Sequence, residues 1–147
     1  MKHSKIKELK KEYEKKRKIY KELPSFDELN DEFEIERITE HEDTSYLLRS
    51  IRRIIVSRFV STMDFFDGML TTQRIATFIT SKWISNSEKE AIYKIIETIM
   101  KLLIKTLESD LIYSEKNEAE TIILLYNEWQ KLKKETLKLI KNIAKKL

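Results

Sequence analysis

Glycine and proline are almost absent from this chain, because Gly68 and Pro24 are the only ones in 147 residues. β-rich and α/β domains need many tight turns, and these two residue types supply most of the unusual backbone dihedrals of such turns. A chain with one of each can make few tight reversals, so we expect long helices joined by short polar loops. The same scarcity excludes the glycine-rich loops that cradle phosphates in nucleotide-binding proteins.

Cysteine is also absent, which excludes disulfides, thiol catalysis and cysteine-ligated zinc. No uncharged apolar run approaches the roughly 18 residues of a membrane span, and the N-terminus is lysine-rich rather than apolar. We therefore expect a cytoplasmic protein that makes no contact with a membrane.

Candidates for chemistry are few. His3 lies in an expected frayed terminus and His41 in a polar loop, and neither has the serine and carboxylate neighbours of nucleophilic catalysis. Asp64 and Asp67 are three residues apart on one helical face and could offer oxygen ligands to Mg²⁺, but the C-terminal end of a helix disfavours anions. We expect no enzyme, no catalytic residue, no metal site and no cofactor.

What the chain does have is charge in blocks and abundant Ile, Leu, Lys and Glu, a composition also seen in thermophiles and in AT-rich genomes. Residues 1–23 carry ten Lys/Arg and four Glu, a net charge of +6. Residues 27–43 carry nine Asp/Glu and one Arg, a net charge of −8, and residues 130–147 carry seven Lys and one Glu, a net charge of +6. Such blocks favour either pairing within the chain or contact with a polyanion.

Apolar residues recur at helical spacing along most of the chain. The sequence predicts an all-α bundle of five or six helices in two parts, a partly projecting basic helix at 1–23 and a helical bundle at 24–147. The expected helices span residues 2–22, 26–33, 45–66, 72–83, 88–112, and from a polar break at 114–117 to the C-terminus. The alternation of apolar residues from Phe33 onward also allows an extended stretch to Ile38, before a polar loop at 39–43.

Helix ends are marked by a few residues. Pro24 ends the first helix, and Ser25 with Glu28 forms a capping box for the second. Gly68 is expected to end the helix at 45–66 in a left-handed conformation. Ser87 with Glu90 forms a second capping box, which opens the long helix at 88–112; this helix is expected to turn Ile92, Ile95, Ile96, Ile99, Leu103 and Leu107 toward the core.

An arginine cluster in the helix at 45–66 is the first candidate contact surface. Arg49, Arg52 and Arg53 share one helix face, with Arg58 further along. Guanidinium groups bind carboxylates and phosphates, so the cluster could bridge to the acidic residues 27–43, contact a protein partner, or touch nucleic acid.

The acidic residues 27–43 are either a solvated face or a surface that docks on a basic partner. In the second case the apolar part of the contact would be Phe26, Leu29 and Phe33. The lysine-rich C-terminus is either a solvated helix end or a nucleic-acid surface, in which case the contacts would be Lys133, Lys134, Lys138, Lys141 and Lys145.

One stretch resembles a known family. The run at 47–55, Leu-Leu-Arg-Ser-Ile-Arg-Arg-Ile-Ile, is followed by Arg58 and, downstream, by Ser-Glu-Lys-Glu at 87–90, which opens a long helix. This order is similar to the helical domain of archaeal GINS subunits, and the short segment at 26–33 could match the helix that precedes it. The resemblance covers about residues 26–105.

The resemblance implies a non-catalytic assembly subunit that works with the replicative helicase in DNA replication, and it carries over no catalytic residue. Residues 69–84 have no counterpart in that pattern, and the chain has no match to the small β domain of the family. We therefore expect a non-enzymatic subunit that contacts one or more proteins through helix faces, as a hetero- or homo-oligomer. The alternative is direct nucleic-acid binding through the lysine-rich N- and C-terminal helices.

Overall fold

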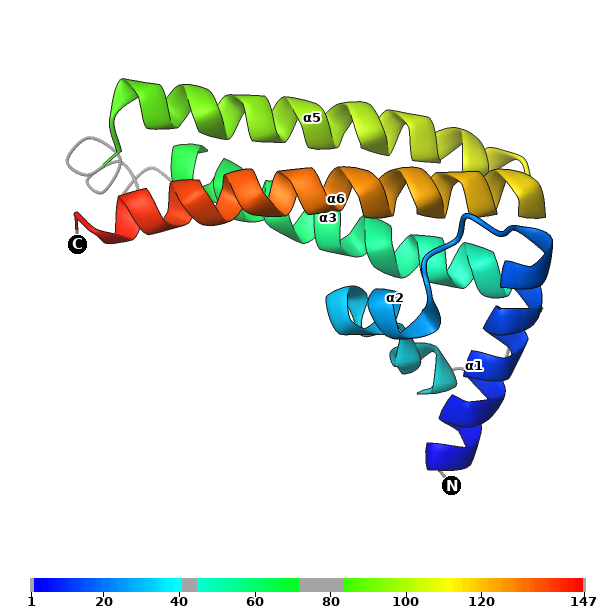
Figure 1. Ribbon diagram of the computed structural model, residues 1–147. Helices are drawn as coiled ribbons and strands as arrows, with labels where there is room; N and C mark the ends of the chain where they lie inside the picture. The colour runs from blue at the N-terminus through cyan, green and yellow to red at the C-terminus, as the bar shows by residue number, and fades with distance from the viewer. Residues whose placement is uncertain (1, 41–44, 72–83, 147) are drawn as a thin grey trace. The chain divides into compact units, whose positions relative to one another are not determined.

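The computed structural model describes residues 2–40, 45–71 and 84–146. In these residues it contains five α-helices and one 3-10 helix and no strand, which confirms the predicted all-α bundle. The elements are α1 (Lys2–Ile19), α2 (Phe26–Phe33), η1 (Ile35–Glu40), α3 (Leu47–Thr71), α5 (Asn86–Leu111) and α6 (Glu115–Ala144) (Figure 1). The helix expected at 72–83 and His41 with most of its loop lie outside the described residues.

The chain divides into two compact units. Unit 1 comprises Met1–Arg58 and Thr106–Asn127, and unit 2 comprises Phe59–Lys105 and Glu128–Leu147. Each of the three long helices therefore contributes residues to both units. The boundary expected at residue 24 stays a prediction, and α1 belongs to the same unit as α2 and η1.

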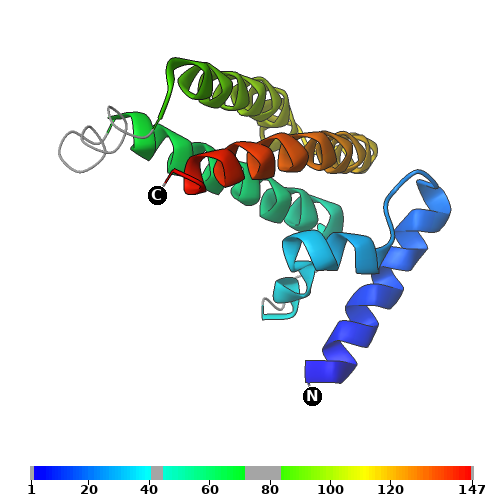
Figure 2. The ribbon, with the colours of Figure 1, turned by 60° about the vertical axis from the view of Figure 1, so that its left-hand side comes forward.

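In unit 1, α1 packs through one face and exposes the others. Leu9 and Tyr13 are buried, and the Tyr13 hydroxyl donates a hydrogen bond to the carbonyl oxygen of Pro24, 2.5 Å away. Lys10 forms an ion pair with Asp27 at 3.2 Å. Figures 1 and 2 both show α2 beside α1, while the lysine-rich N-terminal turns extend past it, as expected of a partly projecting helix.

The turn into α2 follows its predicted chemistry. The backbone N–H of Glu28 donates to Oγ of Ser25 at 3.1 Å, and the same Oγ donates to the Glu28 carboxylate at 3.0 Å. Both ends of the helix are therefore determined locally, because Glu34 adopts a left-handed conformation with φ of 55° directly after Phe33.

The extended alternative for residues 34–38 is wrong, since the structure has the 3-10 helix η1 there. Three residues per turn place Ile35 and Ile38 on the same side, and both are buried. Asn30 fixes this turn, because its side-chain oxygen accepts from the backbone N–H of Glu36 at 2.9 Å.

Two predicted helix ends are corrected. Helix α3 continues to Thr71, and Gly68 lies within it without a positive φ. A glycine lowers helix stability by about 1 kcal/mol but does not by itself end a helix. Helix α5 begins at Asn86, and its cap is Ser85 rather than Ser87: the Ser85 N–H donates to Glu88 Oε1 at 2.9 Å and Ser85 Oγ accepts from the Glu88 N–H at 3.2 Å.

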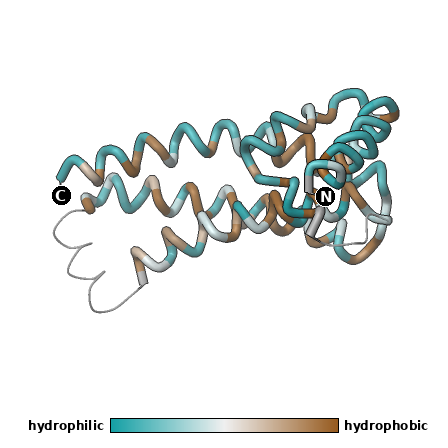
Figure 3. The backbone as a smooth tube through the Cα atoms, turned by 90° about the horizontal axis from the view of Figure 1, so that it is seen from below, coloured by the Kyte–Doolittle hydropathy of each residue, from teal (hydrophilic) through white to brown (hydrophobic). Residues whose placement is uncertain are grey.

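The core of unit 2 lies between the C-terminal part of α3, the N-terminal part of α5 and the C-terminal part of α6. Phe59 and Trp129 meet edge to face with ring centroids 5.2 Å apart. Figure 3 shows brown and teal alternating along these helices, the pattern of amphipathic packing. Besides Phe59, the buried apolar side chains of unit 2 are Phe66, Ile84, Ile92, Ile95, Ile99, Leu102, Leu132, Leu139 and Ile143.

Candidate functional site

The predicted arginine cluster lies at the centre of an internal ion-pair network in unit 1. Arg52 is fully buried, as is Glu118 on α6, and Nε of Arg52 donates to Oε2 of Glu118. Nη2 of Arg52 donates to Oδ1 of Asp110 on α5 at 2.7 Å. Arg49 donates from Nε to Oε1 of Glu118 at 3.1 Å, so one carboxylate holds two guanidinium groups.

The network is closed by neighbouring polar and aromatic groups. Arg49 donates to the backbone carbonyl of Ser109, and its guanidinium carbon lies 5.0 Å from the centroid of the Tyr113 ring. Asn117 donates from Nδ2 to Oγ of Ser109 at 2.8 Å. With each of these donors satisfied, the cluster joins α3, α5 and α6 within unit 1.

Hydrogen bonds within the network favour the ionised forms of Arg52 and Asp110. Burial alone would lower the pKa of Arg52, but its hydrogen bonds to Glu118 and Asp110 outweigh burial and raise that pKa above its ordinary value. The hydrogen bond from Arg52 lowers the pKa of Asp110 despite partial desolvation of that carboxyl. A buried pair of this kind fixes how helices pack rather than adding much net stability.

The four arginines therefore differ in what they can contact. Arg49 and Arg52 pair with carboxylates on α5 and α6, and no pairing with the described acidic residues between 27 and 40 accompanies them. Arg53 is exposed and lies 3.5 Å from Asp110, and Arg58 is partly exposed. Arg52 is too buried to meet a partner or a phosphate.

The apolar part of the predicted partner surface is corrected as well. Phe26, Leu29 and Phe33 are buried in the core of unit 1, because α2 is amphipathic and turns its apolar face inward. They do not form an exposed contact surface. The acidic side chains of α2 lie on the outside, where Asp27 pairs with Lys10 and Glu28 accepts from the Tyr126 hydroxyl at 3.1 Å.

The lysines of the nucleic-acid alternative lie in unit 2. Lys133 is partly exposed, and four others are exposed at positions that alternate by four and three residues, which places them along one side of α6: Lys134, Lys138, Lys141 and Lys145.

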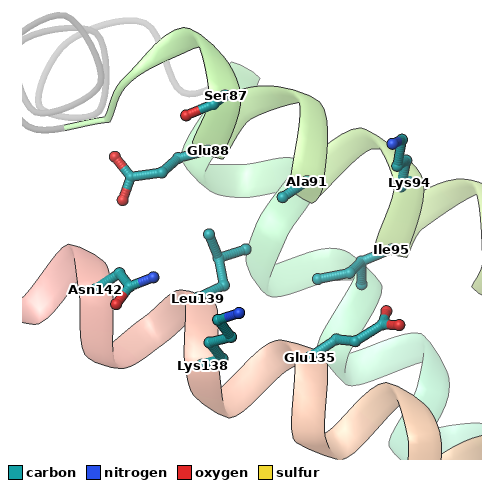
Figure 4. A pocket seen from close by; sticks show the side chains of 9 residues that line it. All are labelled: Ser87, Glu88, Ala91, Lys94, Ile95, Glu135, Lys138, Leu139 and Asn142. Carbon is teal, nitrogen blue, oxygen red and sulfur yellow. The ribbon is translucent and has the colours of Figure 1, made fainter.

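A groove in unit 2 runs between α5 and α6 (Figure 4). It has a volume of about 390 Å³, and Figure 4 shows Leu139 directed from α6 toward α5, with the Glu88 carboxylate near one end. Lys146 donates to Glu88, and this bond together with the Ser85 N–H lowers the pKa of the Glu88 carboxyl. The charged residues that line the groove are two glutamates and two lysines: Glu88, Glu135, Lys94 and Lys138. Because the two signs are balanced, the groove favours neither an anionic nor a cationic ligand.

The residues that sequence reasoning missed lie on the outward face of α5. We call five side chains the outer stripe: Tyr93, Met100, Ile104, Leu107 and Leu111. All are exposed, and Ile104 and Leu111 expose 65% and 77% of their surface. Leu107, predicted to face the core, is 57% exposed. Glu97 fills the one gap in the spacing and pairs with Lys101 at 2.8 Å.

The geometry of α5 itself aligns the outer stripe. The positions 93, 97, 100, 104, 107 and 111 alternate by four and three residues, the heptad spacing that keeps side chains on one face of a helix. Because α5 is one continuous helix, this alignment is a property of the helix, whichever unit each residue belongs to. The inward positions Ile92, Ile95, Ile99 and Leu102 follow the same spacing on the other side.

No group of three or more histidine, cysteine, aspartate or glutamate side chains is placed to hold a metal ion within residues 2–40, 45–71 and 84–146, and Asp64 and Asp67 are exposed. None of the described helices combines the length and hydropathy needed to cross a membrane.

No protein-family model, curated protein or solved structure matches this chain.

Proposed function

We propose that this protein is a non-enzymatic assembly subunit that binds a protein partner through the outer stripe of α5. The observation that carries the proposal is a line of large apolar side chains exposed along one helix face, from Tyr93 to Leu111. At 1.5 Å per residue this line is about 27 Å long. Apolar surface of this extent is costly to leave in water and is typical of interaction sites.

The proposal moves the contact surface from α3 to α5. The guanidinium groups of Arg49 and Arg52 are already paired inside unit 1, and the apolar side chains of α2 belong to the core. The outer stripe, in contrast, has both the apolar area and a charged border, with Lys94, Lys101 and Glu108 beside it. An apolar centre with a polar rim is the usual anatomy of a protein interface.

DNA replication is the setting we propose for this subunit. Its support is the sequence resemblance of residues 26–105 to the helical domain of archaeal GINS subunits, which implies a non-catalytic assembly subunit that works with the replicative helicase. On this view the protein is a structural accessory of the replication machinery, and it needs no catalytic group of its own.

A site-specific crosslinking experiment tests the contact surface. A photo-crosslinking amino acid is placed at Ile104 in the outer stripe and, as a matched control, at Leu137, an exposed leucine of α6. In native cells treated with nuclease after irradiation, we expect protein adducts from position 104 and few from position 137. Equal adduct patterns at the two positions would contradict a role for the outer stripe.

Nucleic-acid binding is the second candidate, and the specific observation that favours it is the exposed lysine side of α6. Lys134, Lys138, Lys141 and Lys145 present four cations along about three turns of one helix. Lysines spaced in this way can contact successive phosphates of a nucleic-acid backbone.

Salt dependence tests this candidate. Binding to duplex DNA, measured by fluorescence anisotropy, should weaken with salt by a log–log slope of roughly −0.9 for each phosphate contacted. The double variant Lys138→Ala/Lys141→Ala should make that slope shallower by about 2, whereas Lys15→Ala/Lys18→Ala on α1 should leave it unchanged if α6 is the site. An unaltered slope in the α6 variant would remove the lysine side of α6 from consideration.

A further inference from the structure

We propose that the occupant of the outer stripe is the outer stripe of a second copy of this chain, paired antiparallel across a two-fold axis near residue 102. This inference rests on the proposed function and names the partner. A two-fold interface uses the same surface on both subunits, so the surface must complement itself. The apolar side chains of the outer stripe and the border charges at its two ends complement themselves when the two helices run antiparallel.

The apolar positions match when the helices run in opposite directions. Tyr93 then lies opposite Leu111 of the partner subunit, and Met100 opposite Ile104 of the partner subunit. The heptad spacing puts these side chains into the a and d layers of a coiled-coil seam. Each large side chain at one end of the stripe meets one at the other end, and the central four pack around the two-fold axis.

The border charges also match in this orientation. The position after each of Tyr93, Met100 and Leu107 flanks the seam, and these positions hold Lys94, Lys101 and Glu108. In an antiparallel pair such flanking positions face each other across the seam. Lys94 therefore lies opposite Glu108 of the partner subunit, once at each end, and both side chains are exposed and available for pairing. By the same geometry Lys101 lies opposite Lys101 of the partner subunit beside the two-fold axis, where Glu97 of its own helix, 2.8 Å away, offsets its charge.

Glu97 decides against the parallel orientation. In a parallel pair with matched ends, Glu97 would lie against Glu97 of the partner subunit inside the seam, where two like charges repel. In the antiparallel pair it lies beside Leu107 of the partner subunit, and Lys101 of its own helix neutralises it at 2.8 Å. A single polar residue in a seam is a known way to set the orientation of paired helices.

The first test is the oligomeric state of the full chain in solution. Light scattering after gel filtration should give twice the 17.7 kDa chain mass at micromolar concentrations, with dissociation on dilution. Ile104→Glu should give the monomer mass, and Leu137→Glu, an equally drastic change on exposed α6 surface, should leave the dimer intact. Circular dichroism should show the same helix content for both variants. A wild-type chain that stays monomeric at several hundred micromolar would overturn the proposal.

The second test is a charge exchange, which leaves the apolar residues unchanged. Lys94→Glu and Glu108→Lys should each raise the dimer Kd by about threefold to tenfold, because each turns two attractive pairs into repulsive ones. The double variant restores opposite charges across the seam and should return the Kd to near the wild-type value. A double variant weaker than both single variants would contradict the antiparallel pairing.

The third test reads the orientation directly. The chain has no cysteine, so Glu90→Cys, one turn before Tyr93, provides a unique attachment point for a spin label. In the antiparallel dimer the two labels lie at opposite ends, separated along the helix axis by roughly 36 Å. In a parallel dimer they would lie about 10 Å apart. A short distance would overturn the orientation.

These outcomes separate this inference from the proposed function. A monomeric wild-type chain that still gives Ile104-specific adducts with other proteins would overturn self-pairing and leave the assembly role standing. A dimer that forms through the outer stripe and binds nothing else would support self-pairing while contradicting a wider assembly role.

Discussion

The ion-pair network of unit 1 buries charged side chains, whereas the outer stripe of α5 exposes apolar ones. Both arrangements are the reverse of what is usual in a folded protein. Arg52 and Glu118 are charged and fully buried, whereas Ile104 and Leu111 are apolar and largely exposed. The buried charges are tolerated because they satisfy each other and their neighbours, which removes the penalty of an unpaired ion. The exposed apolar residues have no comparable compensation within α5. A buried charge is therefore explained by its partners inside the chain, whereas a row of exposed apolar side chains indicates a partner outside it.

Removing one partner of the buried Arg52–Glu118 ion pair should have the largest effect on stability. Glu118→Ala leaves Arg52 buried without its principal carboxylate, and we expect a loss of about 3–5 kcal/mol in the free energy of unfolding. Urea denaturation followed by circular dichroism measures it. The control is Glu120→Ala, an exposed glutamate on the same helix, which should change stability by less than about 0.5 kcal/mol.

A double variant sharpens that result. Arg52→Met/Glu118→Leu removes both fully buried charges together and should recover much of the stability lost in Glu118→Ala, because Arg52 is no longer buried without its principal carboxylate. Arg49 also loses Glu118 but keeps its hydrogen bond to the Ser109 carbonyl. If the loss of unfolding free energy in the double variant equalled the sum of the losses in Arg52→Met and Glu118→Leu alone, the two residues would act independently, contrary to their hydrogen bonds.

The sequence predicts the first part of the fold well, because its signals are local. Ser25 with Glu28 caps α2, and Glu34 closes it, through contacts no more than four residues apart. The end of α1 is less exact, because α1 ends at Ile19, three residues before the end expected from Pro24. At α5 two overlapping Ser-x-x-Glu patterns compete, Ser85 with Glu88 and Ser87 with Glu90. The structure uses the first, and Glu88 is also paired with Lys146, 58 residues away, which no local pattern reveals.

The candidate site was harder to predict for a similar reason. The helix spacing identifies two apolar faces on α5 but not which one the bundle covers, so it predicts a core position for Leu107, which is exposed. The partners of Arg49 and Arg52 lie 58 to 69 residues away, on α5 and α6, beyond the reach of periodicity. The same sequence separation hid the role of Glu118, which carries the network.

Truncating one isoleucine on each face of α5 should give the next largest difference in stability. Ile99 is fully buried, and Ile99→Ala should lower the free energy of unfolding by about 2–5 kcal/mol through lost burial and the cavity left behind. Ile104→Ala removes the same atoms from the outer stripe. At a concentration low enough to keep the chain monomeric, its effect on stability should stay below about 0.5 kcal/mol. Equal losses from the two variants would mean that the outer stripe is packed within the monomer.

Acid should produce the smallest effect, through Asp110 at the rim of the ion-pair network. The hydrogen bond from Arg52 lowers the pKa of Asp110 below its ordinary value of 3.8 in the folded state. A folded-state pKa that is depressed contributes stability above the unfolded-state pKa, and this contribution is lost as the pH falls through the folded-state pKa. The Asp110 side chain is 42% exposed, so solvent weakens the contribution. Asp110→Asn should therefore be less stable than the wild type at pH 7, and the two should converge as the pH falls below 3.8. Urea denaturation at a series of pH values measures the difference, and a gap that widens in acid would contradict the pairing of Asp110 with Arg52.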